Sequence, residues 1–187
     1  MSDADRAKWD ARYRDRGPET TEASPFLARL GDLLPRRGRA LDVAGGAGRN
    51  AVWLARRGLD VTLADVSLVG IALAREAARA AGVRVETIAT DLERDPLPAG
   101  PWDVVLSFHF LRRELFSDFP RVLAPGGLLV YVQPTRRNLE RHDRPPAGFL
   151  LEDAELPSLV QGLEPVSYEE GWLDEGRHEA RMVARKP

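Results

Sequence analysis

The stretch Ala40-Leu41-Asp42-Val43-Ala44-Gly45-Gly46-Ala47-Gly48 decides how this chain is organised. Its apolar first half is followed by a glycine-rich turn, and the residues behind the turn, 49–55, have the composition of a helix. Glycine lets the backbone approach a ligand closely because no Cβ stands in the way. The first turn of a helix offers unpaired N–H groups to that ligand. The stretch therefore predicts a strand, a ligand-binding turn and a helix.

Outward from this stretch, short apolar strands alternate with helices. Strands that are apolar throughout and separated by helices are typical of a parallel sheet covered on both faces. The last two strands differ, because the short connection at Asp174-Glu175-Gly176 allows only an antiparallel hairpin. We expect one α/β fold, a doubly wound, mostly parallel, seven-stranded Rossmann-like sheet with an antiparallel C-terminal hairpin. The expected strands cover residues 41–44, 61–64, 83–89, 104–107, 127–132, 165–170 and 179–185.

Helices are expected between these strands and at the N-terminus. Ser67 can cap a helix that runs to Ala81, where Gly82 ends it. Residues 1–37 are expected to form an N-terminal helical cap, broken at Gly17-Pro18, and residues 38–187 the ligand-binding domain. The other expected helices cover residues 3–14, 25–34, 49–57, 114–123 and 152–163.

The composition limits the classes of function. The 187 residues suit one domain, and a net charge of −2 produces no general attraction for nucleic acid or anionic membrane. The chain has no cysteine, which excludes disulfides and cysteine-ligated zinc, and we expect no metal site. The longest apolar run, residues 127–132, is too short to cross a bilayer. We therefore expect a cytoplasmic protein with no nucleic-acid or membrane partner, and the oligomeric state, monomer or homodimer, stays open.

Two kinds of ligand fit the glycine turn. Residues 46–51 satisfy the pattern G-x-G-x-x-G/A, which in dinucleotide-binding proteins holds a pyrophosphate on the helix N-terminus. The alternative is S-adenosylmethionine, which carries an ammonium and a sulfonium group and no phosphate. A carboxylate at the end of the preceding strand, Asp42, would repel a pyrophosphate and attract a cation. Asp42 therefore favours S-adenosylmethionine, whereas Asp65 can hold ribose hydroxyls in either case.

Five motifs, in this order, resemble those of the class I S-adenosylmethionine-dependent methyltransferases. They are residues 41–50, Asp65 closing the second strand, residues 89–92, residues 102–107 and residues 123–127. The resemblance covers residues 38–133 and departs from the family at Ala44, where the family has glycine. Within the family, residues 9–13 and 48–50 are most similar to small-molecule enzymes of the tellurite-resistance and thiopurine types.

The resemblance implies a role for each residue of a cofactor site. Asp42 would bind the methionine ammonium, directly or through water, and Asp65 the ribose. Asp91 and the Leu92 backbone would meet the adenine. For each of these residues an ordinary structural role in a turn or loop is the alternative. The expected cofactor-binding residues are Tyr13, Asp42, Ala44, Gly46, Gly48, Asn50, Asp65, Val66, Asp91, Leu92 and Ser107.

His109 is the candidate catalytic base. It follows the fourth strand, at the edge of the sheet where open α/β folds bind ligands, and imidazole suits proton transfer at neutral pH. The alternative is that His109 packs between Phe108 and Phe110 and only shapes the pocket. Methyl transfer itself asks mainly for proximity, orientation and exclusion of water, and a base is needed only when the acceptor must lose a proton.

The acceptor is expected to be a small molecule. A basic loop after the fifth strand would suit an anionic acceptor, although a solvated surface loop explains it as well. A non-catalytic S-adenosylmethionine-binding sensor, a nucleic-acid or protein methyltransferase and a nicotinamide enzyme are the alternatives; for base methylation, residues 107–110 lack the Asp/Asn-Pro-Pro-aromatic pattern. The basic residues of the loop are Arg136, Arg137, Arg141 and Arg144.

Overall fold

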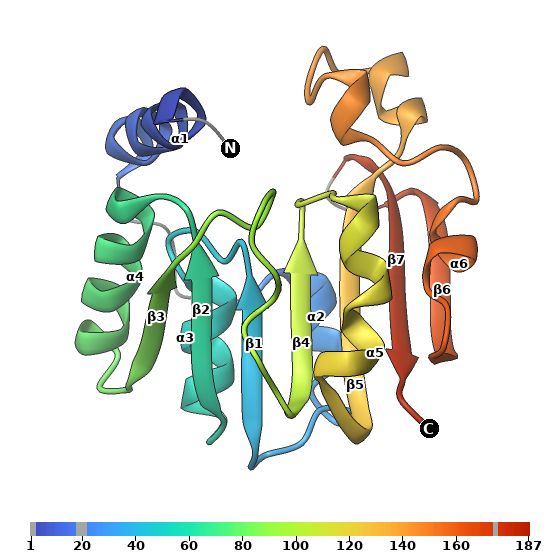
Figure 1. Ribbon diagram of the computed structural model, residues 1–187. Helices are drawn as coiled ribbons and strands as arrows, with labels where there is room; N and C mark the ends of the chain where they lie inside the picture. The colour runs from blue at the N-terminus through green and yellow to red at the C-terminus, as the bar shows by residue number, and fades with distance from the viewer. Residues whose placement is uncertain (1–2, 18–21, 174–175) are drawn as a thin grey trace.

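The computed structural model describes residues 3–17, 22–173 and 176–187 (Figure 1). It has the expected α/β architecture, with one seven-stranded sheet in the order β3-β2-β1-β4-β5-β7-β6. Neighbouring strands run parallel from β3 to β5, whereas β5–β7 and β7–β6 pair antiparallel. The strands are β1 (Arg39–Val43), β2 (Asp60–Asp65), β3 (Val85–Ala89), β4 (Trp102–Phe108), β5 (Leu123–Pro134), β6 (Glu164–Trp172) and β7 (His178–Arg185).

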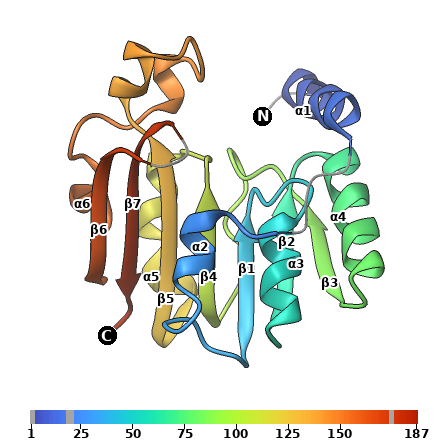
Figure 2. The same ribbon diagram turned by 180° about the vertical axis from the view of Figure 1, so that it is seen from behind.

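Helices cover both faces of the sheet, as the apolar strands predict. One core lies between the sheet and three helices, with Leu27, Leu54 and Ala74 fully buried in it (Figure 2). The other core lies under the segment around Phe116 and Phe119, in front of β4 and β5 in Figure 1. The helical elements are α1 (Asp3–Arg16), α2 (Pro25–Arg29), α3 (Arg49–Arg56), α4 (Leu68–Ala80), η1 (Arg113–Ser117), α5 (Phe119–Val122), η2 (Arg136–Glu140), η3 (Ala147–Phe149) and α6 (Leu156–Leu159).

Three of the expected helices are shorter in the structure. Residues 114–123 form the 3₁₀ turn η1 and the four-residue α5, with Pro120 in the first turn of α5. Residues 152–163 contain only α6, and residues 25–34 contain α2 followed by turns. Proline lacks the N–H that a helix interior needs, so Pro120 and Pro157 lie in the first turns of α5 and α6, and neither expected helix runs through its proline. The expected break at Gly17-Pro18 and the hairpin turn at Asp174-Glu175-Gly176 fall partly outside the described residues.

The carboxyl edge of the parallel strands lies between two covering segments. Helix α1 crosses above the ends of β2 and β3, and the segment with η2 and η3 rises beyond β5 and β7 (Figure 1). Helix α2 behaves differently from α1, because Phe26 and Leu27 are buried in the core. The division into a cap of residues 1–37 and a domain of residues 38–187 stays a prediction. No helix in the described part of the chain is long and apolar enough to cross a membrane.

Asp10 fastens α1 to the rest of the fold. Its Oδ1 accepts hydrogen bonds from the Ser67 hydroxyl at 2.5 Å and from the Val69 N–H at 3.2 Å. The Ser67 hydroxyl in turn accepts from the Gly70 N–H and caps α4. Burial would raise the pKa of Asp10, but these hydrogen bonds and neighbouring arginines lower it below its ordinary value.

We predict that Asp10→Ala lowers the free energy of unfolding by about 1 kcal/mol, the usual cost of losing a capping side chain. Because the folded-state pKa is depressed, this contribution is present above the unfolded pKa, about 3.9, and disappears as the pH falls below it. Urea unfolding at pH 7 and at pH 3 measures both effects. Asp15→Ala, in the exposed part of the same helix, is the matched control and should change little. Equal losses in the two variants would contradict the capping role.

Candidate active site

The glycine turn leaves β1 through three residues with left-handed backbone. Ala44, Gly46 and Gly48 have φ of 54°, 57° and 84°. The Gly45 N–H donates to the Ala64 carbonyl at 3.3 Å, and the Gly46 N–H donates to Asp65 Oδ2 at 2.9 Å. The turn is therefore bound to the end of β2. Ala44 has the conformation that the family's glycine would adopt freely, which costs an alanine about 1 kcal/mol.

Asp42 is buried below this turn with an unsatisfied carboxylate oxygen. The residue is 2% exposed, and Oδ2 has no hydrogen-bond partner in the described part of the chain. A Cβ on Gly45 would stand 2.7 Å from this oxygen, so glycine is required there. Burial, followed by the negative charge of Asp65, raises the pKa of Asp42 to about 7. An orphaned buried acid of this kind fits a missing cationic partner.

Asp65 organises the turn from the end of β2. Its Oδ2 accepts from Gly46, and its Oδ1 accepts from the Ser67 N–H at 2.8 Å, across the half-buried Val66. Burial raises the pKa of Asp65, and the backbone hydrogen bonds oppose that shift. A carboxylate can accept about four hydrogen bonds. The expected ribose contact is therefore compatible with these two, and Asp65 also has the structural role weighed as its alternative.

Tyr13 belongs to α1, and its side chain lies against the glycine turn. A Cβ added to Gly46 would come within 2.1 Å of the Tyr13 hydroxyl, and one added to Gly70 within 3.0 Å of the Tyr13 ring. The absence of side chains at both glycines thus makes room for the tyrosine. The structure places Tyr13, Gly46 and Asp65 in one neighbourhood at the carboxyl edge.

Residues after β3 and β4 complete this edge. Asp91 Oδ1 accepts from the Glu93 N–H at 3.1 Å, and the Leu92 carbonyl accepts from Arg112 at 2.8 Å. Ser107, 1% exposed, ends up beside Val43 through the pairing of β4 with β1.

Asn50 lies in the first turn of α3, directly after the glycine turn. Its Oδ1 accepts the Ser24 N–H at 3.0 Å and so links α3 to the start of α2. It is 7% exposed. This bond gives Asn50 a structural function, and its expected contact with the cofactor stays a prediction.

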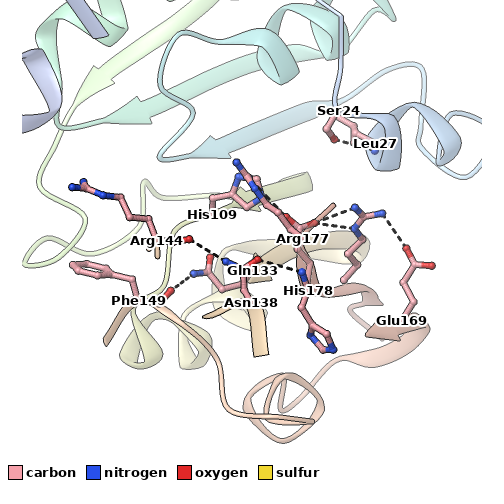
Figure 3. A network of polar contacts seen from close by, with 12 residues as sticks. Ser24, Leu27, His109, Gln133, Asn138, Arg144, Phe149, Glu169, Arg177 and His178 are labelled. Carbon is pink, nitrogen blue, oxygen red and sulfur yellow. Dashed lines mark hydrogen bonds and ion pairs between the residues drawn. The ribbon is translucent and has the colours of Figure 1, made fainter. Parts of the chain in front are cut away.

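His109 lies at the end of β4, on a buried network that sequence reasoning missed. Its Nε2 is 3.0 Å from Glu179 Oε1, and Arg181 holds the other oxygen of Glu179 (Figure 3). Glu179 and Arg181 are 0% and 1% exposed. Charged residues at alternate positions of the otherwise apolar β7 were the available signal, because alternate residues of a strand share one face.

The four arginines of the expected basic loop separate in the structure. Arg136 pairs with Glu152 and Arg137 with Glu140, both at 3.0 Å, and Arg141 lies 4.0 Å from the centre of the Trp172 ring. Arg144 instead belongs to a positive group with Arg12 and Arg177. Burial, followed by the charges of Arg16, Arg177 and Arg144, lowers the pKa of Arg12. The full group is Arg12 and Arg16 from α1, Arg144 from the loop and Arg177 before β7.

A glycine turn lined by acidic side chains, at the switch between β1 and β4, is typical of a protein that binds a cationic nucleoside cofactor. The comparisons agree with this class. Residues 40–127 match the family model described as "Methyltransferase domain". With the motifs described above, this match identifies residues 40–127 as a class I S-adenosylmethionine-dependent methyltransferase domain. S-Adenosylmethionine is the cofactor of this family, and the orphaned Asp42 oxygen and the glycine cradle fit it.

Two curated relatives and one solved structure show the range of the family. The chain is 30% identical to the tRNA 5-carboxymethoxyuridine methyltransferase of Escherichia coli (strain K12), over 68% of this chain and 52% of the relative. It is 36% identical to the demethylmenaquinone methyltransferase of Thermus thermophilus, over 51% and 46%. It thus spans about half the length of the curated relatives it matches. The fold matches TehB from Haemophilus influenzae with a TM-score of 0.76 at 22% identity, over 96% of this chain and 67% of TehB.

We predict that Asp42→Asn raises the free energy of unfolding of the ligand-free protein at pH 8, by about 4 kcal/mol. The folded pKa, about 7, exceeds the unfolded one, so wild-type stability falls as the pH rises from about 4 to about 7. Denaturant unfolding across this range should show the two proteins converging near pH 4. A constant difference at all pH values would show that Asp42 is not the titrating group.

We also predict that Ala44→Gly stabilises the fold by about 0.5–1 kcal/mol, because glycine adopts the left-handed conformation without strain. Ala47→Gly, in the same turn but without a positive φ, is the control and should destabilise. Thermal unfolding of both variants measures the contrast. A loss of stability in Ala44→Gly would mean that the backbone there is unstrained.

Proposed function

We propose that the protein transfers a methyl group from S-adenosylmethionine to a small, negatively charged acceptor. The observation that supports S-adenosylmethionine as the methyl donor is the unsatisfied Oδ2 of Asp42 under a glycine turn. When bound, the cofactor supplies a methyl group already activated on a sulfonium. The work left to the chain is to bind, to orient and to exclude water.

The expected residues divide this work. Asp42 would hold the methionine ammonium, Asp65 the ribose, and Asp91 with the Leu92 N–H the adenine. Gly46 and Gly48 would let the backbone pass below the cofactor. Tyr13 and Val66 would line the sides of the cofactor site. Ser107 would contribute its carbonyl near the methionine. His109, beyond β4, would face the acceptor as its base.

The positive group of Arg12, Arg144 and Arg177 supports an anionic acceptor. These side chains come from three segments that flank the carboxyl edge, and their mutual repulsion would be relieved by a bound anion. The separated pairs of Arg136 and Arg137 with glutamates contribute little to such a site.

Methylation of RNA is the second candidate, since one relative acts by its name on tRNA. The net charge of −2 argues against it, because nucleic-acid affinity rests on an excess of basic residues. Incubation with labelled cofactor and total tRNA decides between the two. Label in tRNA would replace the small-molecule proposal, and binding of cofactor without transfer to any acceptor would favour a sensor.

We predict by calorimetry that the protein binds S-adenosylmethionine and S-adenosylhomocysteine but not NAD. Asp42→Asn should weaken cofactor binding tenfold or more, the value of a lost charge-assisted bond. Wild-type affinity should increase from pH 6 to pH 8, because Asp42 has a pKa of about 7 and must lose its proton to pair with the ammonium. Asp60→Asn, at the opposite end of β2, is the control. Tight binding of NAD alone would overturn the proposal.

A further inference from the structure

A buried carboxylate supports the exposed imidazole at the end of β4. His109 Nε2 lies 3.0 Å from Glu179 Oε1. Glu179 has a fully buried side chain, whereas 34% of the His109 side chain is exposed. Within the described residues, Nδ1 of His109 has no hydrogen-bond partner. One nitrogen of the ring is therefore held by protein, and the other is available to a ligand.

Positive charges hold Glu179 ionised. Arg181 donates from Nε at 3.2 Å and from Nη2 at 3.0 Å to Glu179 Oε2, and Arg177 Nη1 lies 3.9 Å from Oε1. Burial would raise the pKa of Glu179, but the hydrogen bond and charge of His109 and those of Arg181 lower it below its ordinary value. The carboxylate is thus an acceptor for the imidazole N–H at neutral pH.

The Arg181 side chain is held by residues of β6 and α2. Its Nη1 lies 3.4 Å from Glu169 Oε1 on β6, and Arg29 of α2 lies 3.1 Å from the same oxygen. The guanidinium also lies over the Phe26 ring, 5.3 Å from its centre. These contacts leave Glu179 little freedom to move away from His109.

The backbone at His109 also serves this arrangement. Its φ is 61°, a left-handed conformation that is uncommon for residues other than glycine. The His109 N–H donates to the Val132 carbonyl at 2.8 Å, which holds the residue beside β5. A strained backbone that presents a titratable side chain is typical of functional positions.

The geometry points to Glu179 as the positioning residue of a proton-accepting pair in which His109 is the base. The carboxylate accepts Nε2–H, selects the tautomer with a bare Nδ1, and stabilises the imidazolium that forms when Nδ1 takes a proton. This inference rests on the proposed methyl transfer.

The pair favours a hydroxyl compound as the acceptor. A carboxylate acceptor is already ionised, and an amine can attack before it loses its proton, so neither needs a base at the moment of transfer. A hydroxyl does. Its oxygen would bond to the methyl carbon as the carbon–sulfur bond breaks, the bonding pair staying on sulfur, while the hydroxyl proton passes to Nδ1 and later to water. With the positive group nearby, the chemistry fits a hydroxyl compound that also carries an anionic group.

Nuclear magnetic resonance of the histidines tests the pair without cofactor or acceptor, since the chain has only three histidines. We predict that His109 is the Nε2–H tautomer at pH 8. In Glu179→Gln the neutral amide can present its N–H groups as well as its oxygen to the ring, so the preference for the Nε2–H tautomer should weaken. A dominant Nδ1–H tautomer in the wild type, or the same tautomer ratio in both proteins, would overturn the inference.

Two further variants separate this role from stability. Glu179→Gln removes the carboxylate charge that pairs with the buried Arg181, so Glu179→Asp is the second variant. It keeps the charge but withdraws it from His109, and it should also weaken the preference for the Nε2–H tautomer. Glu169→Gln removes a carboxylate from the same network without touching His109. It should lower the melting temperature and leave the His109 tautomer ratio unchanged. A shift in Glu169→Gln as large as in Glu179→Asp would contradict a specific pair.

Transfer assays link the pair to chemistry. With hydroxybenzoates and uncharged phenols as probes, Glu179→Asp should lower kcat tenfold or more and leave the KM for S-adenosylmethionine unchanged. The loss should shrink for phenols that are already ionised at the assay pH. Cofactor binding without transfer to any phenol would overturn the hydroxyl acceptor. Failure to bind cofactor would instead refute the proposed function and leave the tautomer result to judge the pair.

Discussion

The parallel pairing of β1 with both β2 and β4 is the constraint on which the site depends. Strand order reverses at β1, because the chain proceeds from β1 to β2 and β3 on one side and to β4 and β5 on the other. The connections therefore leave the sheet in opposite directions at this point, and the carboxyl ends of β1 and β4 stay uncovered by their own crossovers. Asp42, the glycine turn and His109 all lie where that reversal places them.

Two buried acids at this edge are satisfied in opposite ways. Glu179 is surrounded by His109, Arg177 and Arg181, and its charge belongs to the folded protein. Asp42 has Asp65 as a neighbour and an oxygen without a partner, so its charge is destabilising until a cation arrives. Folding provides Glu179 with its positively charged partners, whereas Asp42 has an oxygen without a partner among the described residues, with which a cationic ligand could pair. A binding site of this type is maintained at the expense of stability.

Much of the fold could be predicted from the sequence, because its signals are local. Each of these signals acts within a few residues: the apolar runs of β1, β2 and β4, the glycine turn and the Ser67 cap. The order of the motifs indicated the cofactor. The segments with proline in the first helical turn were misjudged, since amphipathic spacing says little about whether a helix continues. The contact of His109 with Glu179 could not be predicted. It depends on the register that sets Glu179 opposite Pro134, across strands that are distant in sequence.

Ala44 and His109 adopt left-handed backbone at the ends of neighbouring strands, and the comparison separates two kinds of evolutionary pressure. At both positions glycine would serve the backbone better than the residue present. A drift toward greater stability would therefore convert both to glycine, and for Ala44 such a change removes only a methyl group. At position 109 the same change would erase an imidazole. Under the proposed role of His109 as a base, the backbone at residue 109 is a place where selection for folding and selection for chemistry oppose each other.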